Sequence, residues 1–85
     1  MDISRTEQRV LHLLAQGGCV LVEKDERGRI EDLRIITREG WHHTGMTLEL
    51  FRKLKRRRLI ASANSGPYRI TRLGLVRVRA QADNR

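Results

Sequence analysis

Residues 47–74 read TLELFRKLKRRRLIASANSGPYRITRLG, and most of the evidence for the predicted fold lies in this stretch. A threonine directly ahead of a run with helical periodicity is a favourable N-cap, so Thr47 predicts a helix that runs to about Arg58. At 100° per residue, one face of this helix is apolar and consists of Leu48, Leu50, Phe51 and Leu54. The opposite face carries Glu49, Arg52, Lys53, Arg56 and Arg57, while Lys55 and Arg58 flank the apolar side. The predicted helix is therefore amphipathic and strongly basic.

A short hairpin and a second helix cap follow the basic helix. Residues 59–63 and 68–71 contain strand formers and enclose Asn64–Pro67, whose composition is typical of a turn, so they predict a β-hairpin. Thr71 then caps a predicted helix over residues 72–80. A strand is the alternative for this last segment, because apolar residues alternate with arginines along Val76, Arg77, Val78, Arg79 and Ala80.

The first half of the chain predicts a helix followed by a longer hairpin. Ser4-Arg5-Thr6-Glu7 is a capping box ahead of an apolar-periodic run, so a helix is expected over residues 4–16, with Gly17-Gly18 as its stop. Strands are predicted at residues 19–22 and 30–36, joined by a polar loop. The pattern of residues 37–46 leaves their structure open, and Trp41 is expected in the core together with Phe51.

This order of elements predicts an α+β fold: a small winged-helix-like domain over residues 1–85, with an extra β-hairpin in its N-terminal half. In a winged helix, the helix over residues 47–58 would enter the DNA major groove and the hairpin over residues 61–70 would be the wing. A short helix normally precedes the recognition helix, but Gly40 and Gly45 interrupt that stretch here. Insertion into the groove is therefore an open question for this chain.

The positive charge lies in the second half of the chain. The whole chain has 18 Lys and Arg against 10 Asp and Glu, a net charge of +8, yet residues 1–46 carry a net −1 and residues 47–85 a net +9. Such a distribution favours a polyanion or an acidic protein surface as partner, and a merely solubilising surface is the alternative. The predicted contact residues are Arg52, Lys53, Lys55, Arg56, Arg57, Arg58 and Arg69.

Several other classes of protein are not expected. No apolar run approaches the roughly 20 residues of a membrane-spanning helix, no signal peptide is present, and Cys19 is the single cysteine, so a cytoplasmic location is expected. His12, His42 and His43 lack metal-ligand spacing, so neither a metal nor another cofactor is expected. Because no nucleophile elbow or phosphate-cradling loop is present, we expect a binding protein and not an enzyme.

Three segments carry a resemblance to a known family: LHLLAQGG at residues 11–18, PYRI at residues 67–70, and VRAQADNR at residues 78–85. From residue 4 to the last residue, the chain resembles the YjhX family. This resemblance implies a bacterial toxin of a toxin–antitoxin pair that inhibits DNA topoisomerase I, with that enzyme and a cognate antitoxin as partners.

Two other functions remain open beside this one. The first is a winged-helix-like DNA-binding transcriptional regulator that uses the basic helix over residues 47–58. The second combines both activities: the protein binds topoisomerase near its DNA channel and competes with the anionic substrate. A basic surface would serve each of these functions.

The apolar residues of the last helix fall on two faces, with Leu73, Val76 and Ala80 opposite Leu75, Val78 and Ala82. If one face packs on the domain, the other has no cover, and uncovered apolar surface commonly marks an interface. We therefore expect a homodimer with Leu75 and Val78 in the interface. The alternative is that the same patch docks topoisomerase or the antitoxin and leaves the free protein monomeric.

Overall fold

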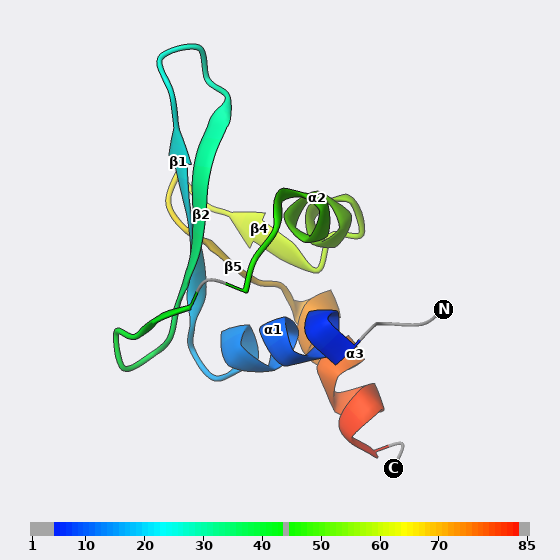
Figure 1. Ribbon diagram of the computed structural model, residues 1–85. Helices are drawn as coiled ribbons and strands as arrows, with labels where there is room; N and C mark the ends of the chain where they lie inside the picture. The colour runs from blue at the N-terminus through cyan, green and yellow to red at the C-terminus, as the bar shows by residue number, and fades with distance from the viewer. Residues whose placement is uncertain (1–4, 44, 84–85) are drawn as a thin grey trace.

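The computed structural model describes residues 5–43 and 45–83, and over these residues the chain forms three helices and a five-stranded antiparallel sheet (Figure 1). The elements, in chain order, are α1 (Arg5–Ala15), β1 (Cys19–Lys24), β2 (Ile30–Ile36), β3 (His42–His43), α2 (Leu48–Arg56), β4 (Ile60–Ser62), β5 (Tyr68–Ile70) and α3 (Arg72–Asp83). The mixed α+β class is thus confirmed. No helix in the described ranges is long and apolar enough to cross a membrane.

The predicted stop of α1 and the predicted cap of α3 are both confirmed. Gly17 has a φ of +107°, and the amides of Gly17 and Gly18 donate to the carbonyls of Leu14 and Leu13 at 3.1 and 3.2 Å, which closes α1. The amide of Gly74 donates to Thr71 Oγ1 at 3.1 Å, so Thr71 caps α3 as predicted. The strand alternative for the last segment is therefore wrong. Ser4 of the predicted capping box lies outside the described residues.

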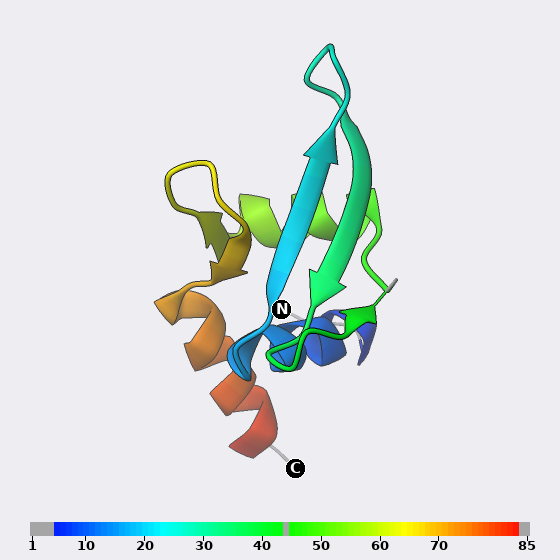
Figure 2. The same cartoon turned by 90° about the vertical axis from the view of Figure 1, so that its left-hand side faces the viewer.

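The sheet has the strand order β3-β2-β1-β5-β4, so β1 is central although it comes early in the chain. Val20 pairs with Ile35 of β2 on one side and with Tyr68 of β5 on the other. Helices α1 and α2 cover one face of this sheet and lie behind the strands in Figure 2. Because paired residues share a face, Val20 and Ile35 both point into the core beneath the helices.

The core combines side chains from all three helices and from the sheet. Its buried apolar members are Val10, Leu11, Leu14, Val20, Ile35, Met46, Leu50, Phe51, Leu54, Leu59, Ile60 and Val78. The prediction for Phe51 is confirmed, but that for Trp41 is wrong: its side chain is 70% exposed. Trp41 closes a tight turn, in which its amide donates to Thr37 Oγ1 at 3.0 Å and its carbonyl accepts from the Thr37 amide at 2.8 Å. This turn directs the ring outward.

Helix α3 packs through a glycine. A Cβ on Gly74 would lie 2.5 Å from the Leu59 carbonyl oxygen and 2.5 Å from Ile70 Cγ1, so only glycine allows this close approach. Val78, one turn further along the helix, is therefore drawn into the core and is only 8% exposed. The prediction that Val78 shares an uncovered face with Leu75 is wrong. Leu75 is exposed on α3, and the homodimer through Leu75 stays a prediction.

The hairpin of β1 and β2 extends well past the rest of the sheet (Figure 1). Its far end is exposed from Glu23 to Arg29, and Asp25 Oδ1 accepts from the amides of Arg27 and Arg29 at 2.9 Å each, which holds the loop in shape. The register shifts by one residue at Glu23/Lys24, a β-bulge near the end of β1. The predicted hairpin is confirmed, and it forms a projecting arm beside α2.

Candidate functional site

Helix α2 presents most of its basic residues to solvent. Thr47 Oγ1 accepts from the Leu50 amide at 3.1 Å, which confirms the N-cap and the start of the helix. Because Leu50, Phe51 and Leu54 are buried on one side of the helix, Arg52 and Arg56 are exposed on the other. Neither forms an ion pair with a residue of the described ranges, so both guanidinium groups are available to a partner.

The helix ends two residues earlier than predicted, at Arg56. Arg57 is its C-cap, and Arg58 has a φ of +61°, the left-handed conformation that terminates a helix. The amide of Leu59 donates to the Leu54 carbonyl at 3.0 Å, and Leu54 and Leu59 are both buried. Burial of this apolar pair fixes the turn and makes a non-glycine residue adopt the left-handed conformation.

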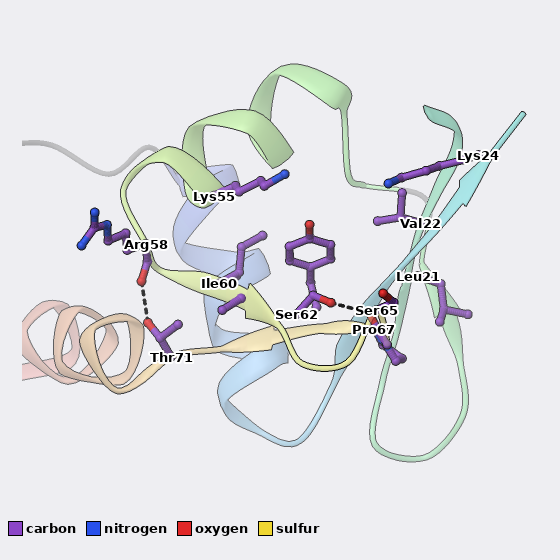
Figure 3. Close-up of a pocket in the computed structure, with 13 residues that line it drawn as sticks. Leu21, Val22, Lys24, Lys55, Arg58, Ile60, Ser62, Ser65, Pro67 and Thr71 are labelled. Carbon is purple, nitrogen blue, oxygen red and sulfur yellow. Dashed lines mark hydrogen bonds between the residues drawn. The ribbon is translucent and has the colours of Figure 1, made fainter. Parts of the chain in front are cut away.

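Thr71 joins the end of α2 to the start of α3. Its hydroxyl donates to the Arg58 carbonyl at 2.7 Å (Figure 3), and its amide donates to the Leu59 carbonyl at 2.9 Å. The position of Arg58 therefore depends on contacts with a residue 13 positions later in the chain.

Lys53 is engaged inside the protein. Its ammonium forms an ion pair and hydrogen bond with the Glu7 carboxylate of α1, and Glu7 is only 5% exposed. Lys53 is one of the predicted contact residues, but in the structure its ammonium connects α2 to α1. The sequence contains a signal for this: Glu7 lies three and four positions before Val10 and Leu11, on the buried face of its helix.

A groove of about 920 Å³ lies between the projecting arm, the end of α2 and the β4–β5 hairpin. Lys24 of β1 and Lys55 of α2 extend toward it from two sides, whereas the Arg58 side chain extends away (Figure 3). The Lys55 ammonium lies 5.7 Å from the centroid of the Tyr68 ring, a cation–π contact. The Phe51 ring meets Tyr68 edge to face at 4.9 Å and holds it in place. Neither Lys24 nor Tyr68 was expected in the site from the sequence.

Arg69 lies on another surface. It is exposed in the middle of β5 and pairs with Ala61 of β4, whereas its neighbours Tyr68 and Ile70 pack against the core. Because side chains alternate across a strand, Arg69 faces away from α2. The structure does not bring it together with the basic residues of the helix.

The titratable groups elsewhere are dispersed. In residues 5–43 and 45–83, no three His, Cys, Asp or Glu side chains are grouped as ligands of a metal ion would be. His42 and His43 are exposed on the short edge strand β3. What the site offers chemically is a set of fixed cations: guanidinium groups on α2 and two ammonium groups at the groove.

These features define a small, basic α+β protein with an exposed cationic helix face and a cationic groove. A family profile described as "Putative toxin of bacterial toxin-antitoxin pair" matches residues 1–85, and the chain belongs to this YjhX toxin family. Membership implies an antitoxin as partner.

Curated relatives match along the whole chain. A UPF0386 protein of Chelativorans sp. (strain BNC1) is 66% identical over 85 residues, 100% of both chains. One of Hyphomonas neptunium is 60% identical over 99% of both chains, and one of Caulobacter vibrioides is 56% identical over 100% of this chain and 93% of the relative. No solved structure matches.

Proposed function

We propose that this protein is a toxin that binds and inhibits DNA topoisomerase I, with the outward side of α2 as its contact surface. The target is the one that the family resemblance implies. The observation that carries the contact surface is the exposed basic side of α2, where Arg52 and Arg56 have no carboxylate partner in the described ranges. The half-buried Arg57 follows them and extends this basic side. We also propose that the protein acts by binding, without catalysis of its own.

Preorganisation supports this surface. Helix α2 is held at its start by Thr47, in its middle by the ion pair between Lys53 and Glu7, and at its end by Thr71. A rigid helix loses little conformational freedom on binding, so its arginines can contribute more of their interaction energy to the complex. Arginine also pairs well with both carboxylate and phosphate, which suits an acidic enzyme surface and the DNA bound to it.

A plasmid relaxation assay tests the proposal. Purified topoisomerase I, with negatively supercoiled plasmid as substrate, should be inhibited by stoichiometric amounts of the wild-type protein. The triple variant Arg52→Ala/Arg56→Ala/Arg57→Ala should inhibit far less. A matched control, Arg27→Ala/Arg29→Ala/Arg69→Ala, removes three arginines from other surfaces and should inhibit like wild type. Absence of inhibition at a large excess of wild-type protein would refute the proposed target.

A second candidate is direct DNA binding by a winged-helix-like regulator. It is supported by the chain order, in which the basic helix α2 is followed directly by the β4–β5 hairpin and then by α3, as expected for a recognition helix and its wing. Against it, strands β2 and β3 occupy the chain where a winged helix has its second helix. The three arginines would then contact phosphates, and log affinity should fall against log salt by about 0.9 per phosphate neutralised. The triple variant should flatten this slope, and an affinity independent of salt would exclude DNA contact by α2.

A further inference from the structure

The groove beside β1 contains an unpaired strand edge. Strand β1 pairs with β2 along its whole length, from Cys19 to Lys24, but its pairing with β5 is confined to Val20 and Tyr68. Pro67 directly precedes β5, and a proline has no amide proton to donate to the ladder. The second edge of β1 therefore has no strand partner over Leu21–Lys24 in the described part of the chain.

This free edge lies inside the groove. Leu21, Val22 and Lys24 of β1 line the groove together with Ser65 and Pro67 of the β4–β5 hairpin. The volume of about 920 Å³ is in the range of sites that hold a small ligand, and it suits a short extended segment. An exposed edge with its backbone groups unpaired is a template for one further strand.

The side chains around this edge differ between its two faces. Val20 points into the core, so alternation places Val22 and Lys24 on the same face, toward α2 and Lys55. Leu21 points to the opposite face. Neither Lys24 nor Lys55 forms an ion pair with a described residue, so one face of an added strand would meet two ammonium groups that have no carboxylate partner there. On the other face, the added strand would lie beside the side chain of Leu21.

From this arrangement we infer that the groove binds an extended acidic segment of a partner polypeptide, which adds as a strand to the Leu21–Lys24 edge of β1. The segment alternates acidic residues, directed at Lys24 and Lys55, with apolar residues directed at Leu21. Backbone hydrogen bonds provide affinity, and the alternation of charge and apolar contact provides specificity. This surface is separate from the outward side of α2, and it does not depend on topoisomerase as the target.

A defined peptide tests the inference. The probe is a fluorescein-labelled six-residue peptide of alternating Glu and Val, whose binding to the full-length protein is measured by fluorescence anisotropy. We expect saturable binding that the double variant Lys24→Glu/Lys55→Glu weakens by about tenfold or more, because two attractions become repulsions. The matched control Arg9→Glu/Arg79→Glu changes the net charge by the same amount at exposed positions of α1 and α3 outside the groove, and it should leave the affinity within about twofold.

Two further measurements separate strand addition from simple charge attraction. A peptide with proline in place of its central Val keeps the charge but loses a backbone donor, and it should bind at least about tenfold more weakly. Hydrogen exchange should slow for β1 amides between Leu21 and Lys24 when the original peptide binds. Circular dichroism checks that the Lys24→Glu/Lys55→Glu variant is folded, and Lys24→Glu alone, at an exposed site, serves if it is not.

Several results would overturn the inference. The inference fails if the Glu-Val peptide does not bind, or if both double variants lose the same amount of affinity for it. It also fails if the proline peptide binds as tightly as the original peptide. Tighter binding of a single-stranded oligonucleotide that also requires Lys24 and Lys55 would identify the groove as a nucleic-acid site instead. None of these outcomes depends on inhibition of topoisomerase, so the inference and the proposed function are tested separately.

Discussion

The Lys53 ammonium of α2 pairs with the Glu7 carboxylate of α1, 46 residues earlier in the chain. The carboxylate is almost fully buried, whereas the lysine side chain is about one third exposed. This contact crosses the two helices that cover the sheet, and it helps to set the direction in which the other basic residues of α2 point.

Replacement of Glu7 by Gln should reduce the free energy of unfolding by about 1–2 kcal/mol, because it removes the charge partner of a half-buried ammonium. Urea unfolding of the wild type, of Glu7→Gln, of Lys53→Met and of the double variant forms a double-mutant cycle that measures the coupling. Glu49→Gln, on the exposed side of α2, is the control and should have little effect. Additive effects of the two single substitutions would show that the pair contributes no coupling energy.

Replacement of Arg58 by Gly should stabilise the protein by about 0.5 kcal/mol, because relief of the left-handed conformation outweighs the greater freedom of glycine in the unfolded chain. Arg57→Gly is the matched control: its φ of −83° suits any residue, so glycine there should destabilise. Thermal and urea unfolding measure the change in the free energy of unfolding for each of the two variants. A loss of stability in Arg58→Gly would mean that the arginine side chain makes a stabilising contact that exceeds its backbone strain.

Replacement of Gly74 by Ala should destabilise the protein by about 3 kcal/mol, since the new methyl group meets the Leu59 carbonyl at 2.5 Å and α3 must move away. In Gly45→Ala, nothing lies within 4 Å of the added Cβ, so a change within about 0.5 kcal/mol is expected. Urea unfolding compares the two. Equal stability of the two variants would contradict the close packing of α3 at Gly74.

A homodimer through the exposed side of α3 should be detectable by light scattering at micromolar concentration. Leu75→Glu should dissociate it and leave the helical circular dichroism intact, because Leu75 lies at the surface. Val78→Glu should instead unfold α3, because it places a carboxylate in the core. A monomeric wild-type protein would refute the predicted dimer. A dimer that persists in Leu75→Glu would show that the interface lies elsewhere.

The elements predicted from the sequence were those with local causes. Thr47 and Thr71 cap helices, the pair Gly17-Gly18 closes a helix, and each hairpin contains its own turn residues, so short-range patterns were enough to locate them. One face of α2 is apolar, and Arg52 and Arg56 lie on the opposite face. Their exposure could therefore also be predicted from the helical periodicity. The family motifs were recognisable for a similar reason, since they are contiguous strings.

The tertiary structure alone decided which of these local elements meet. Pairing of β1 with β5, 48 positions apart at Val20 and Tyr68, ends at Pro67 and so creates the groove. The same packing engages Lys53 with Glu7, turns Arg69 away from α2, buries Val78 and leaves Trp41 in solvent. Helical and strand periodicity specify which side chains share a face, but only long-range packing specifies what that face touches. For this protein, the sequence by itself determined the basic helix, and the fold determined which of its cations are free to bind.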